Sequence, residues 1–393
     1  MDELHVRVVE GEAEVELSFF DLDGKVRDLE RRGRPSLIFT SPGLSPPRPG
    51  LHHSKCGNTR EGAALFYRLE RLACLGTFDF EMREAFDRKD NPFKPLQDRY
   101  PALRAILCEK LTTVGQIVLL RLEEEEEEGQ ERLLLVGNTH LFYHPMAQHI
   151  RLMQMATLVK EMTARRGEIE DKYGVRPRLV LCGDLNSTPT TATIRYLRGE
   201  TIGREDEVWE HLHVFGWGKR QGEGEEKEEG EAAAAAAVVE AEEEKKGGEE
   251  GGDGKAVAVD VGRERRGRET LLPSRATPRV EAREEKEKEK NSKKKGSMAS
   301  DGDVIPTLCL TRPFFSACGL PDFTNYVQGF VETLDYIFLE SEVPAPLDPS
   351  SAGFSVLSVG AMPTREEAGQ DTALPSWQTP SDHVSILCDV RVE

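Results

Sequence analysis

The stretch Arg178 to Pro189, RLVLCGDLNSTP, constrains the fold more than any other part of the sequence. Its apolar run, Leu179 to Cys182, predicts a short buried strand, and Asp184 and Asn186 follow where that strand ends. Period-two alternation predicts that these two polar side chains share one face. A carboxylate and a carboxamide at the C-terminal end of a buried strand can hold a metal-bound water and a phosphate oxygen. The alternative is a structural Asx turn.

Composition describes the solvated tracts of this chain more than its fold. The 393 residues are enough for one large or two ordinary domains. The net charge of −19 comes largely from two low-complexity tracts, 123–128 and about 219–300. An acidic total argues against electrostatic nucleic-acid binding over the whole surface, but it leaves a local basic groove open.

Cysteine number and hydropathy indicate the compartment. The seven cysteines are odd in number and form no CxxC pair, so neither a disulfide framework nor a zinc site is expected. No apolar run approaches the roughly 20 residues of a spanning helix. The acidic start, MDELHVRVVEGEAEVE, is unlike a presequence. We therefore expect a soluble protein without a membrane partner, and no oligomer is predicted.

The N-terminal segment, 1–50, begins as strands and ends as a linker. Alternation over 4–8 and 15–19 predicts a small antiparallel hairpin. Four prolines and two glycines predict a linker over Ser41 to Gly50, and residues 52–59 show no periodicity.

The remaining chain reads as one α/β domain in two parts, 56–218 and 302–393. Continuous apolar runs flanking an acidic tip predict a hairpin, and the wide apolar face of 150–162 predicts a helix. Together with the strand before Asp184, these elements give a βαβ order. Residues 219–301 cannot bury enough apolar surface to order, so a disordered insertion is expected. The expected strands are 63–67, 116–122, 132–140, 179–182, 334–340 and 384–390, with a short apolar segment at 72–78 and a further helix at 80–87.

Four polar clusters lie at the ends of these strands. Each alone is more often structural than catalytic, but all four in this chain order form a specific combination. They are Asn138-Thr139-His140, Asp184 with Asn186, Asp335, and Ser381-Asp382-His383.

Seven stretches carry a resemblance to the endonuclease/exonuclease/phosphatase superfamily, and within it to the 2′,5′-phosphodiesterase and deadenylase branch. The resemblance implies a deoxyribonuclease I-like, four-layer α/β sandwich of two mixed sheets, and phosphodiester hydrolysis. The stretches are EGAALFYR (61–68), NTHLFYHP (138–145), IRLMQM (150–155), CGDLNSTPTT (182–191), FTNYVQGF (323–330), LDYIFLE (334–340) and LPSWQTPSDHVSILCDV (374–390).

The same resemblance implies the catalytic roles. Asp184 would orient or deprotonate the attacking water, and Asn186 would bind the scissile phosphate. His383, polarised by Asp335, would stabilise charge on the phosphoryl oxygens. His140 matches a residue that contacts the phosphate or the leaving group.

It also implies the metal and substrate contacts. Asp382 and Asp184 would hold Mg²⁺, with Mn²⁺ as an alternative. Pro145 and Phe330 match two residues that sandwich an adenine ring, although Phe330 could be a core residue and Pro145 a turn residue. Further substrate contacts are expected from Asn138 and Asn325.

One departure from the family pattern stands out. Two earlier strands of the family supply an asparagine and then a glutamate, the principal metal ligand, in a segment like QEVD. Residues 1–55 contain neither, so the domain is expected to be incomplete on its N-terminal side, with exposed sheet edges. Mg²⁺ is therefore expected to bind weakly, and the chain to be nearly inactive.

Two function classes remain open at this stage. One is a Mg²⁺-dependent 3′-to-5′ exoribonuclease or 2′,5′-oligoadenylate hydrolase acting on RNA ends. The other is a catalytically dead relative that binds RNA. A deoxyribonuclease or lipid phosphatase is disfavoured by NTHLFYHP and FTNY. The family match implies mitochondria, and the visible N-terminus makes the cytoplasm the alternative.

Overall fold

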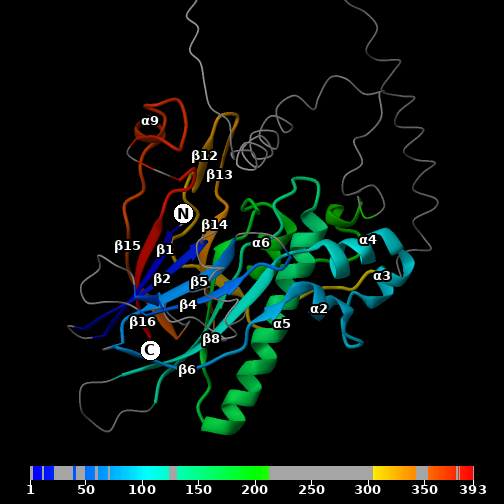
Figure 1. Ribbon diagram of the computed structural model, residues 1–393, viewed down its shortest axis with the longest axis horizontal. Helices are drawn as coiled ribbons and strands as arrows, with labels where there is room; N and C mark the ends of the chain where they lie inside the picture. Colours follow the sequence, from blue (N-terminus) through cyan, green and yellow to red (C-terminus); the bar gives the residue numbers. More distant parts are fainter. Residues whose placement is uncertain are drawn as a thin grey trace, which may run out of the picture. The chain divides into compact units, whose positions relative to one another are not determined.

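The computed structural model describes most of the chain outside its low-complexity tracts (Figure 1). All described residues lie in one compact unit. They are 3–10, 13–21, 39–40, 49–57, 61–69, 71–123, 131–210, 212, 304–341, 353–377, 379 and 381–392.

Two mixed sheets form the centre of this unit (Figure 1). Sheet A has the strand order β15-β16-β1-β2-β5-β4-β3. Its strands are β1 (Glu3–Glu10), β2 (Ala13–Asp21), β3 (Phe39–Thr40), β4 (Pro49–Ser54), β5 (Gly62–Tyr67), β15 (Phe354–Val359) and β16 (Ile386–Val392).

Sheet B has the strand order β11-β14-β10-β9-β8-β6, and β7 pairs with β8 beside it. Its strands are β6 (Leu72–Thr77), β7 (Phe80–Glu81), β8 (Val114–Leu122), β9 (Leu133–Asn138), β10 (Arg178–Asp184), β11 (Phe314–Ser316) and β14 (Asp335–Glu340). A separate hairpin joins β12 (Asn325–Val327) to β13 (Phe330–Glu332).

The predicted βαβ unit is confirmed in sheet B. β9 and β10 are parallel, with Leu134 opposite Arg178, and helix α5 (Gln148–Tyr173) connects them. The β8–β9 hairpin is also confirmed as an antiparallel pair, and its predicted acidic tip, 124–130, lies outside the described residues. The carboxyl ends of β9 and β10 therefore meet at one edge, which brings His140 close to Asp184.

The N-terminal hairpin is confirmed, but the linker prediction is wrong at its end. β1 and β2 pair antiparallel, as the alternation predicted. Pro49 and Gly50, expected in the linker, begin β4, which continues through His52 to Ser54. This strand forms because β5 offers a pairing edge and Leu51 is buried between the sheets, although the sequence there lacks alternation. Residues 41–48 lie outside the described part.

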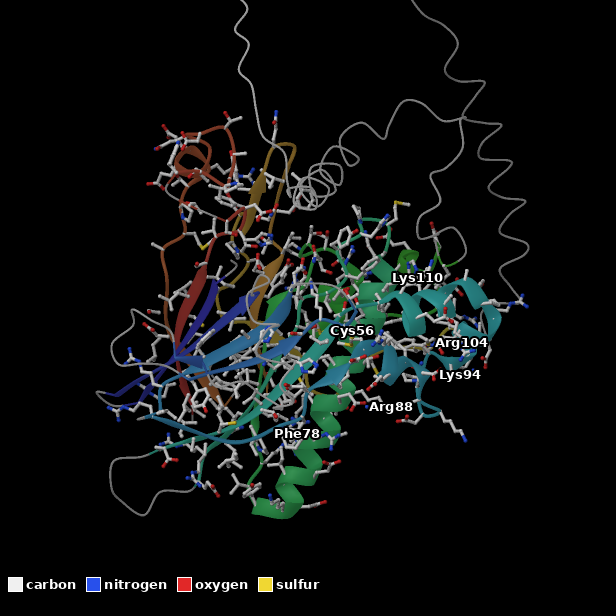
Figure 2. The ribbon with its side chains drawn as sticks, viewed as in Figure 1. Cys56, Phe78, Arg88, Lys94, Arg104 and Lys110 are labelled. Atoms are coloured by element: carbon white, nitrogen blue, oxygen red, sulfur yellow. The ribbon has the colours of Figure 1, made fainter. Side chains whose placement is uncertain are left out.

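The described helices other than α9 (Arg365–Ala368) pack on sheet B. α2 (Met82–Asp87), α3 (Lys94–Arg99), α4 (Pro101–Ala105) and the π-helix η1 (Ile106–Lys110) form one group. Figure 2 shows Arg88, Lys94, Arg104 and Lys110 on this helical group. The helix expected over 80–87 begins two residues later, because Phe80 and Glu81 pair with β8 instead. The helix expected over 150–162 is confirmed and longer, and it ends at Gly174 in a left-handed conformation (φ 71°).

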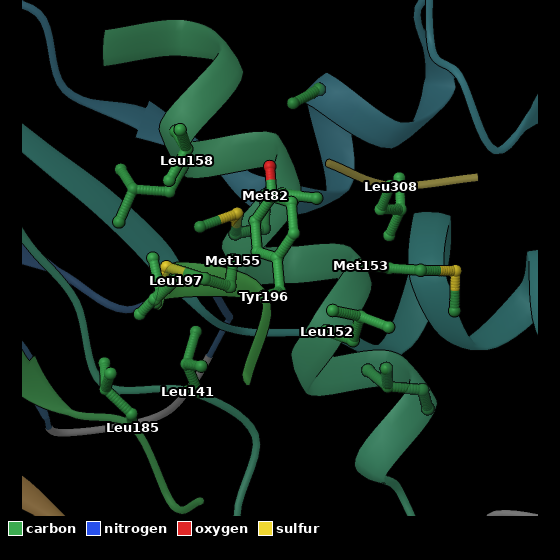
Figure 3. Packing of buried hydrophobic residues seen from close by; sticks show 14 of the residues in the cluster. Met82, Leu141, Leu152, Met153, Met155, Leu158, Leu185, Tyr196, Leu197 and Leu308 are labelled. Atoms are coloured by element: carbon green, nitrogen blue, oxygen red, sulfur yellow. The ribbon is translucent and has the colours of Figure 1, made fainter. Parts of the chain in front are cut away.

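Two hydrophobic cores hold these layers together. The first lies between the helices and sheet B, where Leu152, Met155 and Leu158 of α5 pack against Tyr196 and Leu197 of α6 (Ala192–Leu197), as Figure 3 shows. The second lies between the sheets and includes side chains from β5, β8, β10, β14 and β16. Leu141 and Leu185 belong to the first core, so the loops that follow β9 and β10 are fixed by buried side chains.

A buried ion pair also ties α5 to sheet B. Arg166 donates to both carboxylate oxygens of Glu340 at 2.6 Å, and both side chains are 9% exposed. Such a pair favours one register of α5 on sheet B, because another register would leave a buried charge without its partner. The remaining elements are the 3₁₀-helix η2 (Glu207–Trp209) and α9 (Arg365–Ala368).

The predicted insertion, 219–301, lies outside the described residues. Among the described helices, none is long and apolar enough to cross a membrane.

Candidate active site

Asp184 and Asp335 lie side by side at one edge of sheet B. Asp184 is the last residue of β10 and Asp335 the first of β14, and the two are direct partners in the antiparallel register. Both are buried, at 8% and 2% exposed. Like charges directly opposite each other repel, so this pairing needs a cation or hydrogen-bond donors nearby.

A tight turn joins Asp184 to Asn186. The strand ends at Asp184, and Asn186 has φ 44°, so period-two alternation does not place these residues on one face as predicted. The turn brings them together instead: the Asn186 backbone N–H donates to Asp184 Oδ1 at 2.8 Å. The Asn186 Nδ2 group donates to the carbonyl of Leu141 at 2.9 Å and lies 3.4 Å from Asp184 Oδ2. The carboxylate is thus held by its own loop.

Gly183 makes this approach possible. Its φ of 138° is unfavourable for other residues, and an added Cβ would lie 1.9 Å from the carbonyl oxygen of Thr139. The glycine in CGDLN is therefore required by the close contact between the two loops.

His383 pairs with Asp335 as the resemblance implied. His383 Nδ1 lies 2.7 Å from Asp335 Oδ2, and the side chains are 9% and 2% exposed. Thr324 Oγ1 donates to the same carboxylate oxygen at 2.6 Å and accepts the backbone N–H of Asp335 at 3.0 Å. Because the carboxylate accepts at Nδ1–H, a substrate contact from this imidazole would use the Nε2 atom.

These residues form a group that could hold a metal ion. Ligand atoms of Asp184, Asp335 and His383 lie within 4.8 Å of one another. Asp335 Oδ1 is buried and has no hydrogen-bond partner, so it is a free acceptor for a cation. Mg²⁺ commonly takes one or two protein carboxylates and completes its shell with water and phosphate, so this donor set fits it.

His140 approaches the group from β9. Its Nε2 lies 3.5 Å from Asp184 Oδ2, and its Nδ1 lies 3.2 Å from Lys55 Nζ. Lys55 in turn forms an ion pair with Glu61. Sheet A thus contributes two charged residues, from the end of β4 and the start of β5, to a site whose carboxylates belong to sheet B.

A buried arginine holds the loop after His140. Arg151 is 4% exposed, and its Nη1 donates to the carbonyls of Phe142 at 3.2 Å and His144 at 2.6 Å. Burial lowers the pKa of Arg151 to about 10, and the negative charge of Asp184 opposes this shift. Burial, followed by the charge of Arg151, also lowers the pKa of His144. Arg151 therefore fixes the loop through backbone carbonyls.

Asn138 is a further predicted site residue. Asn138 is buried, and its Nδ2 donates to the carbonyl of Ala64 and to Gln116 Oε1, both at 3.1 Å. The bond to Ala64 joins sheet B to sheet A, and the bond to Gln116 lies within sheet B. A substrate contact from Asn138 stays a prediction.

Asn325 lies beside His383 in an isolated bridge. Its Nδ2 donates to the carbonyl of Asp382 at 3.4 Å, and its buried Oδ1 has no partner. The carboxylate of Asp382 is not in the three-residue group, so its metal role stays a prediction. Pro145 is exposed, and Phe330 is 39% exposed at the start of β13, so neither is a core residue.

Sequence reasoning missed Thr324, Arg151, Lys55 and Glu61. Thr324 stands within FTNY, Arg151 within IRLMQM and Glu61 within EGAALFYR, so three of the four lie in stretches that carried the resemblance. Lys55 had no signal, because it lies in a segment without periodicity.

Comparison with known proteins supports one family. No family model matches the chain. It is 25% identical to 2′,5′-phosphodiesterase 12 of Rattus norvegicus over 331 residues, covering 84% of this chain and 38% of that protein. It is 24% identical to carbon catabolite repressor protein 4 homolog 1 of Arabidopsis thaliana, covering 85% and 43%.

One solved structure has a similar fold. The crystal structure of ANGEL2, a 2′,3′-cyclic phosphatase, in complex with adenosine-2′,3′-vanadate, matches with a TM-score of 0.50 at 16% identity, covering 94% of this chain and 80% of that one. In sequence the chain resembles the endonuclease/exonuclease/phosphatase superfamily. It is related to phosphodiesterases of that superfamily, and it spans about two fifths of the length of the two curated relatives named above.

Proposed function

We propose that the chain is a Mg²⁺-dependent phosphodiesterase that hydrolyses RNA ends, as a 3′-to-5′ exoribonuclease acting on poly(A), a 2′,5′-oligoadenylate hydrolase, or both. The observation that carries the proposal is the 2.7 Å contact of His383 with Asp335 beside the Asp184–Asn186 turn. Two carboxylates, one imidazole and one amide at a sheet edge match the needs of phosphodiester hydrolysis.

In this proposal each polar group has one task. Asp184, held by the Asn186 backbone, takes a proton from the attacking water or orients that water. Asn186 Nδ2 lies at the same turn, and it would exchange its longer contact, 3.4 Å to Asp184 Oδ2, for a hydrogen bond to the phosphate. His383, whose Nδ1 is fixed by Asp335, places Nε2 toward the phosphoryl oxygens, where a positioned donor stabilises developing charge. His140, whose Nε2 lies 3.5 Å from Asp184 Oδ2, would contact the leaving group.

The metal is part of the proposal. Asp184 and Asp335 would hold it, using the unpartnered Asp335 Oδ1, and Asp382 is the further predicted ligand. A bound Mg²⁺ would polarise the phosphoryl oxygens and lower the pKa of a coordinated water. Mn²⁺ is accommodated by the same oxygen donors.

Phe330 and Pro145 are proposed to hold the terminal base. Both side chains are exposed, which leaves their apolar surfaces available to a base. Base stacking contributes roughly 1 to 3 kcal/mol, so it would favour adenine-rich ends. The substrate partner is thus RNA or oligoadenylate, and a mitochondrial location follows only from the likeness to the 2′,5′-phosphodiesterases.

The four-layer sandwich belongs to this proposal as well. The described helices other than α9 pack on sheet B, and the family's second helical layer would cover the outward face of sheet A.

A second function is favoured by one observation. Among the described residues, the group of Asp184, Asp335 and His383 contains no glutamate. Mg²⁺ prefers octahedral geometry and dehydrates reluctantly, so the loss of a dedicated ligand weakens binding. The alternative is therefore a relative that binds RNA without cleaving it.

One experiment separates the two functions. The purified full chain is given a 2′,5′-linked and a 3′,5′-linked oligoadenylate with increasing Mg²⁺, and AMP release is measured beside RNA binding. Mg²⁺-dependent release that Asp184→Asn abolishes supports the enzyme. Binding that is equal in both proteins, without release at any Mg²⁺ concentration, supports the alternative.

A further inference from the structure

Lys55 and Glu61 form a charged pair next to His140 that the catalytic proposal does not use. Lys55 directly follows β4, and its backbone N–H donates to the carbonyl of Glu61 at 2.8 Å just before β5. The side chain of Lys55 is only 10% exposed. Figure 2 labels Cys56, the next residue, and so locates this part of the chain. Backbone pairing therefore fixes the origin of the lysine side chain.

The ammonium group contacts two side chains. It forms an ion pair with the carboxylate of Glu61, and Nζ lies 3.2 Å from His140 Nδ1. An ammonium can only donate hydrogen bonds, so Nδ1 of His140 must be the acceptor. In a neutral imidazole, the ring proton then lies on Nε2.

The position of the His140 ring proton also determines its contact with Asp184. His140 Nε2 lies 3.5 Å from Asp184 Oδ2, so the Nε2–H group faces the carboxylate and the space beside it. The opposite tautomer would place Nδ1–H against the ammonium and an acceptor lone pair against the carboxylate. Both contacts would be unfavourable.

We propose that Lys55, held by Glu61, is a positioning residue that sets the Nε2–H tautomer of His140 and so makes this imidazole a hydrogen-bond donor to the substrate phosphate or leaving-group oxygen. The contact of His140 with the substrate rests on the proposed function, whereas the assignment of its tautomer does not. Carboxylates and carbonyls are the usual partners that set a histidine tautomer by accepting from Nδ1–H. Here a donor sets the reverse tautomer.

The first test is spectroscopic and needs no activity. The full chain with ¹⁵N-labelled histidine is examined at a slightly alkaline pH, where imidazoles are neutral, and His140→Gln assigns the resonance. We expect His140 to show an unprotonated Nδ1 and a protonated Nε2. A protonated Nδ1 in the unsubstituted protein would overturn the proposal.

Three variants test the cause. Lys55→Met keeps the aliphatic stem and removes the donor, so the two tautomers of His140 should become mixed. Lys55→Arg keeps a cationic donor and should restore the Nε2–H form. Lys160→Met removes a lysine that pairs with Asp90 at the surface and should change nothing. An unchanged His140 spectrum in a folded Lys55→Met protein would contradict the proposal.

Turnover of oligoadenylate gives the second readout. Lys55→Met should lower kcat by roughly tenfold or more, as for the loss of one charge-assisted hydrogen bond, with little change in KM. Lys55→Arg should recover most of it. If the tautomer behaves as expected but no protein hydrolyses the substrate, the proposed function fails and the positioning role stands.

Discussion

Asp184 and Asp335 are direct partners across two antiparallel strands, β10 and β14, and both are buried at the same sheet edge. Two carboxylates in this relationship repel each other unless hydrogen-bond donors or a cation lie nearby. The donors at hand are the Asn186 backbone for Asp184, and Thr324 and His383 for Asp335. Asp184 is thus placed to act on a water molecule, whereas Asp335 is placed to orient the imidazole of His383.

Asp335 and His383 should act as one unit. His383→Ala and Asp335→Asn should each lower kcat by roughly 10² to 10⁴, because either change removes the same oriented donor. The double variant should cost little more than the worse single one. Steady-state kinetics on oligoadenylate measures this, and fully additive losses would show that the pair does not work together.

Arg151 should stabilise the loop that carries His140 to Pro145. Arg151→Met leaves the carbonyls of Phe142 and His144 without their buried donor, so the free energy of unfolding should fall by about 2 to 4 kcal/mol. KM should rise as the loop loosens. Urea unfolding and kinetics measure both. Arg204→Met, at a 58% exposed side chain, is the matched control and should change neither.

Acid should weaken the same loop through His144. Burial lowers its pKa below the ordinary 6.5, and its Nδ1 accepts the Met146 backbone N–H at 3.2 Å, which requires an unprotonated nitrogen. The unfolded chain therefore binds more protons near pH 6.5. The stabilisation is present above about pH 6.5 and is lost as the pH falls through the lower folded pKa.

Urea midpoints at about pH 7.5 and about pH 5.5 test this prediction. His144→Gln should reduce the drop in stability between them. The same drop in both proteins would rule out His144 as its source.

Residues 219–300 should be dispensable for the fold. Their composition lacks the apolar residues needed for a core, and the described parts on either side already complete sheet B. Replacing them with a short Gly/Ser bridge should leave the melting temperature unchanged, and limited proteolysis of the full chain should cut there first. Protection from protease, or unfolding of the shortened protein, would show that the tract is structural.

Much of this fold was predictable because its strands are continuous apolar runs with polar ends. The strands before Asp184 and after Leu334, and the helix between β9 and β10, follow from periodicity alone. β4 was not predictable, since it is stabilised by pairing with β5 and by the burial of Leu51. Tertiary contacts override weak local patterns in such strands.

The site residues were likewise predictable only in part. The residues at strand ends, Asp184, Asp335 and His383, were predictable in kind, and the structure brings them within one group. The joint placement of Asp184 and Asn186 was predicted for the wrong reason, because a turn with φ 44° and not strand alternation produces it. Lys55 was beyond prediction, since its contact with His140 spans 85 residues and two sheets.

The most direct test of the account is Mg²⁺-dependent hydrolysis of oligoadenylate by the full chain, compared with Asp184→Asn and His383→Ala. Without a glutamate in the described metal group, we expect turnover that is slow, that saturates only at high Mg²⁺, and that both substitutions abolish. RNA binding should persist in all three proteins. Equal AMP release by the unsubstituted chain and Asp184→Asn, or no release at any Mg²⁺ concentration, would contradict the assignment of this site as a hydrolytic centre.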